Sequence, residues 1–213
     1  MDDPKLIVAD EPTPGLDLDL AVRALDDFRT FANEGGGVLL ITHDIELALR
    51  VADRIAVFKE GTVVEETAVA NFADPHLLQH PFTRSLWHAL PEHEFASGDA
   101  RDEASLPACR ANVAPKDDGA SRSCQRALEA RSITFGHNPS HLIYQDFSLT
   151  VKPGERVALA APSGFGKTTL CRLLAGYEVP QQGSVLVDGE PLPRTGTCPV
   201  QLIGQRPEET IDP

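Results

Sequence analysis

A glycine-rich stretch at residues 161–170, APSGFGKTTL, has the residue types and spacing of a phosphate-binding loop. Glycines at such a turn allow backbone N–H groups and a helix N-terminus to face an anion. Lys167 would reach the β- and γ-phosphates of a nucleotide, and the hydroxyl of Thr168 would bind Mg²⁺. Ala161 stands in place of the first glycine, which costs about 1 kcal/mol if that position needs a positive φ. The expected nucleotide-binding residues of the loop are Ser163, Gly164, Phe165, Gly166, Lys167, Thr168 and Thr169.

The alternative for this stretch is an ordinary glycine-rich turn between a strand and a helix. The apolar run RVALAA before the loop and the run TTLCRLLAG after it favour the nucleotide loop, because the motif needs a strand on one side and a helix on the other.

Two carboxylates end an apolar run near the N-terminus, in KLIVADEP at residues 5–12. Asp10 can hold Mg²⁺ from the end of a buried strand, and Glu11 can act as the base that orients or deprotonates an attacking water. His43 ends the next apolar run, VLLITHD, from where it could contact a γ-phosphate. The alternative for all three is a solvated or capping side chain at a strand end. Their order is reversed, because the acidic strand comes before the phosphate loop.

The patterning around these residues predicts an α/β fold with a mostly parallel sheet and an antiparallel β element. KLIVAD and GVLLITHD are compact apolar runs of the kind that buried parallel strands make. Residues 19–33 have the apolar spacing of an amphipathic helix, and a second helix is expected from Lys167 to about residue 175. RIAVFKEGTVVEET predicts two short strands around a Glu-Gly turn. Alternation of strands and helices indicates a parallel sheet.

Composition divides the chain into segments 1–91, 92–126 and 127–213. The middle segment is poor in large apolar residues and predicts a flexible linker, and roughly 35 such residues span about 30–35 Å. The net charge of −13 argues against a nucleic-acid surface. No apolar run approaches the roughly 18–20 residues of a membrane span. The cysteines lack metal-binding spacing and are expected to be free thiols in a reducing cytoplasm.

Together these motifs resemble those of ATP-binding-cassette (ABC) ATPases, which are P-loop NTPases with a RecA-like core. DEPTPGLD at 10–17 resembles the family's acidic motif and D-loop, with Asp17 as the D-loop residue, and ITHD at 41–44 resembles its histidine loop. The stretch HPFTRSLWHALP at 80–91 is similar to the C-terminal extension of peptide and nickel importer ATPases.

The third segment resembles the N-terminal half of a cassette. Phe135 or His137 would occupy the position of the aromatic residue that stacks on adenine, where many members have tyrosine. VQLIGQRPEETIDP resembles the Q-loop, with Gln205 as the expected ligand of magnesium and sensor of the γ-phosphate.

The resemblance implies that 1–91 is the C-terminal half of a first cassette and 127–213 the N-terminal half of a second. It implies binding of ATP and Mg²⁺, a second cassette as dimer partner, and integral-membrane permease subunits as further partners. It also implies a cytoplasmic location for the chain, peripheral on the inner face of the cell membrane. Lys167 and Asp10 would then serve different sites. The family's LSGGQ-like signature is absent from the sequence, so the isolated chain is expected to hydrolyse ATP poorly.

The two halves could also be arranged in a second way. The two halves can fold together as a circularly permuted cassette core without the helical signature subdomain, which would bring Lys167 and Thr168 next to Asp10 and Glu11. The leading functional interpretation is the ATPase of a peptide or nickel importer. The alternatives are a catalytically silent cassette fragment and a non-transport cassette ATPase. A P-loop kinase fits less well, because the acidic pair, D-loop and histidine have no role there.

Overall fold

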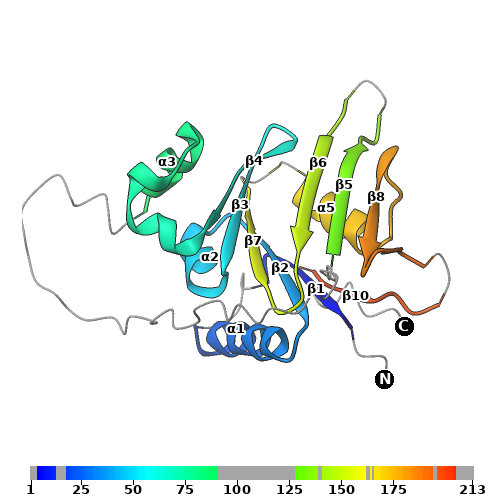
Figure 1. Ribbon diagram of the computed structural model, residues 1–213, viewed down its shortest axis with the longest axis horizontal. Coiled ribbons are helices and arrows are strands. Elements are labelled where there is room, and N and C mark those ends of the chain that lie inside the picture. Colours follow the sequence, from blue (N-terminus) through cyan, green and yellow to red (C-terminus); the bar gives the residue numbers. More distant parts are fainter. Residues whose placement is uncertain are drawn as a thin grey trace, which may run out of the picture.

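A computed structural model describes residues 4–12, 18–90, 128–138, 141–161, 164, 166–193 and 196–204, with backbone alone for 18–22 (Figure 1). The α-helices are α1 (Leu18–Asn33), α2 (Ile45–Val51), α3 (Pro81–His88) and α5 (Lys167–Leu174). The strands are β1 (Leu6–Asp10), β2 (Gly37–Thr42), β3 (Arg54–Lys59), β4 (Thr62–Ala68), β5 (Leu128–Phe135), β6 (Tyr144–Val151), β7 (Arg156–Ala160), β8 (Gln182–Val187), β9 (Glu190–Pro191) and β10 (Val200–Ile203). Two 3-10 helices cover Val69–Ala73 and Pro75–Leu77.

A six-stranded sheet in the order β10-β1-β2-β7-β3-β4 forms the centre of the molecule. All neighbouring strands in it are parallel except β3 and β4, which form an antiparallel pair. The predicted Glu-Gly turn between them is present, and both of its residues, Glu60 and Gly61, have positive φ. A second sheet, in the order β6-β5-β8-β9, is entirely antiparallel. The predicted fold class, a mostly parallel sheet with an antiparallel β element, is therefore confirmed.

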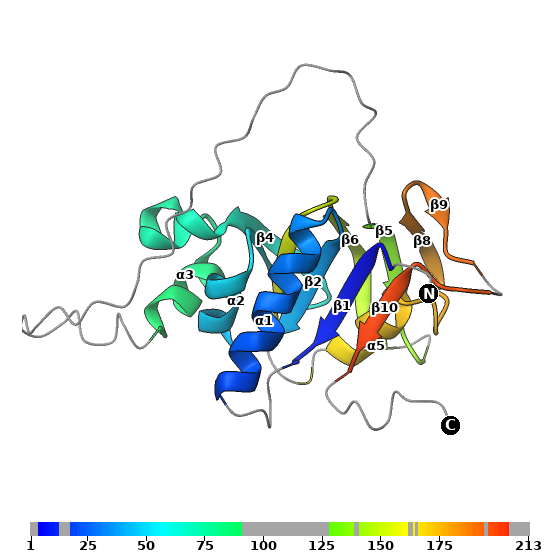
Figure 2. The same cartoon turned by 90° about the horizontal axis from the view of Figure 1, so that it is seen from below.

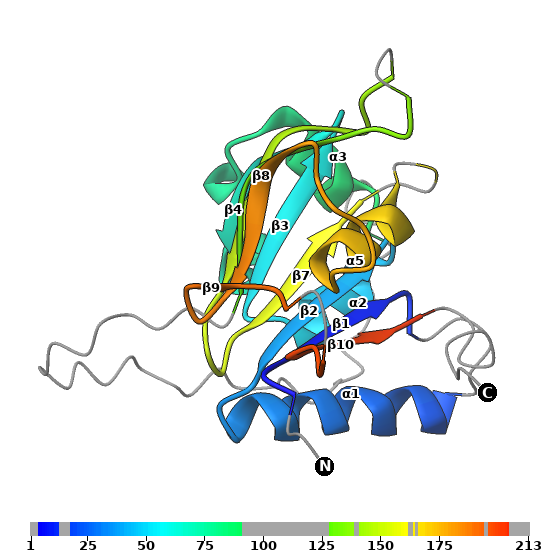
Figure 3. The same cartoon turned by 90° about the vertical axis from the view of Figure 1, so that its right-hand side faces the viewer.

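Both faces of the parallel sheet are buried, as its continuous apolar strands predict. Val38 and Leu40 pack with Phe28 of α1, together with α2, on one face. Leu39 and Ile41 pack on the other face with α5 and the antiparallel sheet. Figure 3 shows this layering, with α1 on one side of β1, β2 and β10 and α5 on the other. Within the described residues no helix is both long and apolar enough to cross a bilayer.

Strands from the first and third predicted segments are interleaved in the parallel sheet. β7, from the third predicted segment, lies between β2 and β3, which belong to the first. β10 lies beside β1 at the sheet edge, although the two strands come from opposite ends of the chain (Figure 2). The predicted linker, residues 92–126, lies outside the described residues. The two flanking segments thus share one sheet in this structure.

Candidate nucleotide site

The predicted site residues meet where β1, β2 and β7 end. These strands are parallel neighbours with β2 in the middle, and in register Asp10 lies beside Ile41, and Thr42 beside Ala160. Parallel strands that stop level with one another bring the residues that follow them to one edge of the sheet, where open α/β sheets bind ligands. Asp10, Glu11, His43 and the phosphate loop therefore converge, although Asp10 and Thr168 are 158 positions apart in the chain.

The turn into α5 depends on two glycines. Gly164 has φ +86° and Gly166 has φ +81°, in the left-handed region that glycine tolerates best. A Cβ on Gly166 would lie 2.6 Å from Ile143 Cγ2, so the turn is crowded as well. Ala161 is not among the residues with positive φ. Alanine therefore fits where the motif has its first glycine, and the strain considered for that position does not arise.

A buried tyrosine that the sequence reasoning missed supports this turn. The Tyr144 hydroxyl donates a hydrogen bond to the Gly166 carbonyl at 2.5 Å, from a side chain that is 1% exposed. Burial raises the pKa of Tyr144, so the hydroxyl stays protonated and able to donate. The available signal was chemical, because a buried tyrosine hydroxyl needs a partner.

Glu11 lies between two groups that can carry positive charge. Its Oε1 contacts Lys167 Nζ and lies 2.9 Å from His43 Nδ1. The Lys167 and Glu11 side chains are each only 9% exposed, whereas His43 is 54% exposed. Burial alone would raise the pKa of Glu11, but the hydrogen bonds and charges of Lys167 and His43 outweigh it and lower the pKa. Glu11 is thus an ionised carboxylate, at a non-glycine residue with φ +45°.

Asp10 and Thr168 form the second half of the site. The Thr168 hydroxyl donates to Asp10 Oδ2 at 2.8 Å, and Asp10 is 2% exposed. Asp10 Oδ1 is buried and has no hydrogen-bond partner among the described residues. Burial raises the pKa of Asp10, because an ionised carboxylate is poorly solvated there. A free carboxylate oxygen beside a threonine hydroxyl fits Mg²⁺, which takes few protein ligands and completes its shell with phosphate and water.

The remaining predicted residues divide into three groups. Phe135 lies in the hydrophobic core at 8% exposure, with its ring centroid 5.2 Å from that of His137. His137 is exposed, so of the two it is the ring open to a base. Thr169 is partly exposed in the first turn of α5. Four further expected site residues lie outside the described residues: Asp17, Ser163, Phe165 and Gln205.

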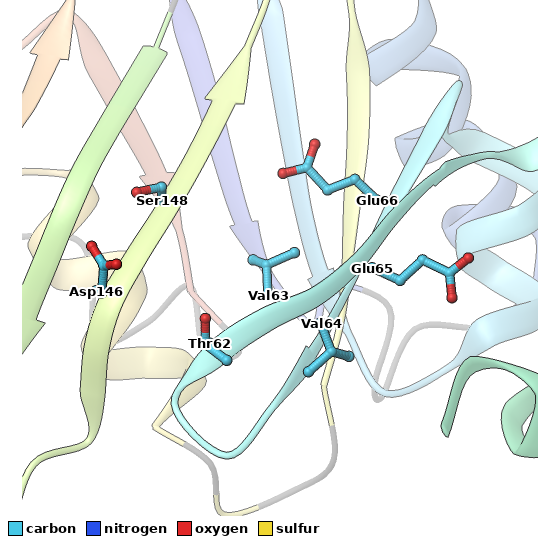
Figure 4. Close-up of a pocket in the computed structure, with 7 residues that line it drawn as sticks. All are labelled: Thr62, Val63, Val64, Glu65, Glu66, Asp146 and Ser148. Carbon is cyan, nitrogen blue, oxygen red and sulfur yellow. The ribbon is translucent and has the colours of Figure 1, made fainter. Parts of the chain in front are cut away.

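A separate hollow lies between β4 and β6 (Figure 4). Among its lining residues are three carboxylates, from Glu65, Glu66 and Asp146. Those negative charges would repel a phosphate group, whereas the phosphate loop offers Lys167 and a helix N-terminus. The nucleotide interpretation therefore applies to the edge formed by β1, β2 and β7, and not to this hollow.

Comparisons with known proteins point to one family. Residues 144–209 match the family model described as ABC transporter. The chain is 30% identical over 220 residues to the "Uncharacterized ABC transporter ATP-binding protein YejF" of Escherichia coli, covering 99% of this chain and 38% of that protein. It is 30% identical over 237 residues to the "Glutathione import ATP-binding protein GsiA" of Pectobacterium atrosepticum, with 99% and 37% covered.

A shorter match is stronger in identity. Over 99 residues the chain is 41% identical to the "Oligopeptide transport ATP-binding protein OppD" of Lactococcus lactis subsp. cremoris, covering 46% of this chain and 28% of that protein. The chain therefore spans less than two fifths of the length of each of these relatives.

Proposed function

Because the chain belongs to the ABC transporter ATPase family, we propose that it binds Mg-ATP at the edge where β1, β2 and β7 end. The observation that carries this proposal is the direct contact between the phosphate-loop residues and the acidic strand end. Lys167 contacts Glu11, and Thr168 donates a hydrogen bond to Asp10. These are a cation for phosphate and two oxygens for a divalent metal, within one small region.

Each residue has a distinct role in the proposed site. Lys167 and the backbone N–H groups at the N-terminus of α5 bind the β- and γ-phosphates. Asp10 and Thr168 hold Mg²⁺, which neutralises charge that develops on the phosphates. Glu11 accepts a proton from the attacking water, and His43 contacts the γ-phosphate from its exposed position. Gln205 and the D-loop residue Asp17 complete the proposed set.

The proposed base, Glu11, contacts two neighbouring side chains in this structure. Glu11 Oε1 contacts Lys167 Nζ and lies 2.9 Å from His43 Nδ1, so this oxygen would accept a proton from water only after those groups move. Phosphate attracts the Lys167 ammonium more strongly than Glu11 does, because phosphate carries more negative charge than one carboxylate. ATP binding would therefore release Glu11 at the moment when a base is needed.

Hydrolysis is proposed for an assembly larger than this chain. The sequence lacks the signature motif, so a second cassette would have to supply it. The proposed partners are that cassette and integral-membrane permease subunits, and the proposed location of the chain is the cytoplasmic face of the membrane. Because relatives are named for glutathione import and oligopeptide transport, we propose a peptide-type substrate for the transporter.

The test is calorimetric binding of Mg-ATP to wild type, to Lys167→Ala and to the control Lys152→Ala. Lys152 is exposed and outside the site, so its replacement should leave affinity unchanged. Lys167→Ala should abolish measurable binding, and equal affinity in all three proteins would refute the proposed site. Adding a signature-bearing cassette then tests turnover. Binding that never leads to hydrolysis would favour the catalytically silent alternative.

A further inference from the structure

The first part of the chain has a gap in its sheet that only one strand fills. β2 and β3 belong to residues 4–90, yet neither pairs with the other, because β7 lies between them and is parallel to both. Val157, Ala158 and Leu159 of β7 are fully buried. Without a strand in this position, the facing N–H and C=O groups of β2 and β3 would lose their partners. Residues 4–90 therefore need a central strand from another segment.

Four charged residues hold β7 at its start, at the sheet edge opposite the nucleotide site. Arg54 Nε donates to Glu155 Oε1 at 2.9 Å, and Arg54 Nη2 lies 3.3 Å from Glu155 Oε2. Asp53 Oδ2 accepts from the Arg156 backbone N–H at 2.9 Å and from Arg156 Nε at 3.0 Å. We name Asp53, Arg54, Glu155 and Arg156 the charge clasp. Each pair joins one residue before the predicted linker to one after it.

The clasp is placed to discriminate between strands. The Arg54 and Glu155 side chains are 20% and 17% exposed, so an unmatched charge there would be poorly solvated. Both arginines make fork-shaped contacts that demand a fixed carboxylate position. A slip of β7 by one residue would turn its side chains to the opposite faces and separate both pairs. A strand without Glu-Arg at its start would leave Arg54 with Glu66 as its remaining carboxylate partner.

We propose that the charge clasp selects the strand that fills the gap, and that the selected strand is the chain's own β7. One molecule then brings together the two halves of the proposed nucleotide site, although their order in the chain is reversed. The position of β7 also affects the proposed nucleotide site, because the phosphate loop follows the C-terminal end of β7. Lys167 meets Glu11 only when β7 is seated between β2 and β3.

Charge reversal tests the selection. In a Glu66→Gln background, which removes the remaining carboxylate beside Arg54, the variants are Arg54→Glu, Glu155→Arg and the double reversal. Each single variant should raise the unfolding equilibrium constant by at least about tenfold, and the double should return it to within about threefold of the background. Arg131→Glu disrupts an ion pair within the second half, with Glu129, in which the Arg131 side chain is 56% exposed, and is the control. Additive single effects, without recovery in the double, would overturn the proposal.

If the reversals do not yield folded protein, Arg54→Gln and Glu155→Gln replace them. Coupling then predicts that the double neutral variant is less destabilised than the sum of the singles, whereas strict additivity overturns the clasp. The free energy of unfolding of all these variants is measured in urea without nucleotide. A failure of the charge-clasp proposal can therefore be distinguished from a failure of the ATP proposal.

Mixing tests whether the strand comes from the same molecule. Arg54→Glu and Glu155→Arg chains, co-expressed with different tags, should show no recovery of stability and no co-purification. Light scattering of the wild type should give a monomer. Recovery in the mixture would mean that each chain accepts β7 from a second copy, and this would overturn the same-chain assignment.

Discussion

Replacing Glu11 by Gln should lower the free energy of unfolding of the protein without nucleotide and should raise its affinity for nucleotide. Glu11 Oε1 contacts Lys167 Nζ and lies 2.9 Å from His43 Nδ1, and the Lys167 side chain is only 9% exposed. A glutamine of the same shape keeps a neutral acceptor but removes the charge. Lys167 is then a buried ammonium with a weaker partner, which lowers the free energy of unfolding by about 1–3 kcal/mol.

The same change frees Lys167 for phosphate. A hydrogen bond to a charged group is worth about 1.5–3 kcal/mol, and a neutral acceptor retains roughly half of that. Nucleotide binding no longer has to break the stronger contact, so the binding free energy should become more favourable by about 0.8–1.5 kcal/mol, or roughly 4- to 13-fold in affinity. ADP is the ligand of choice because it has no γ-phosphate to hydrolyse. A loss of turnover in the variant therefore cannot be mistaken for tighter binding.

The assay combines calorimetry with ADP and urea unfolding, on wild type, Glu11→Gln and the control Glu129→Gln. Glu129 also pairs with a cation, Arg131, but outside the site, so its replacement should leave ADP affinity unchanged. Unchanged or weaker ADP binding by Glu11→Gln would refute the argument that Glu11 and phosphate compete for Lys167. An unchanged free energy of unfolding would refute the argument that the contact between Glu11 and Lys167 stabilises the protein without nucleotide.

Four further results are expected. Lys167 and His43 lower the pKa of Glu11, so the stability that Glu11 contributes is present at neutral pH and is lost as pH falls through its folded pKa. The difference in unfolding free energy between wild type and Glu11→Gln should therefore narrow below about pH 4. Burial raises the Asp10 pKa, so its ionised form opposes folding at neutral pH. Asp10→Asn should then stabilise the protein by about 0.5–2 kcal/mol at pH 7 while weakening magnesium-dependent ATP binding, and lower stability would contradict this. Gly166→Ala should cost more stability than Gly164→Ala in thermal unfolding, because both have positive φ but only Gly166 also meets neighbouring atoms. Tyr144→Phe should cost about 0.5–1.5 kcal/mol in the same measurement by removing the hydrogen bond to the Gly166 carbonyl, and an unchanged midpoint would show that this bond adds nothing.

Much of the site was predictable from local sequence. A phosphate loop is a contiguous strand, turn and helix, so its glycines, Lys167 and Thr168 can be recognised in one stretch of ten residues. The strands β1 and β2 were predictable because burial on both faces demands continuous apolar runs. The carboxylates and the histidine follow those runs directly, so their place at strand ends was predictable as well. These features depend on residues that are neighbours in the chain.

Other features depend on which distant strands pair. The sequence left open whether Lys167 and Asp10 serve one site or two, and the seat of β7 between β2 and β3 puts them together in this structure. The burial of Phe135 could not be read from its own stretch, since it follows from packing of the antiparallel sheet against α5.

The sequence by itself therefore determined which side chains are candidates for binding phosphate and magnesium, because residue type and local backbone conformation decide what a loop can bind. Only the tertiary structure decided the partners of each group: Glu11 for Lys167, the Gly166 carbonyl for Tyr144, and Glu155 for Arg54. The physical reason is that strand order and register are set by the summed burial and hydrogen bonding of the whole sheet. No single stretch of sequence contains that sum.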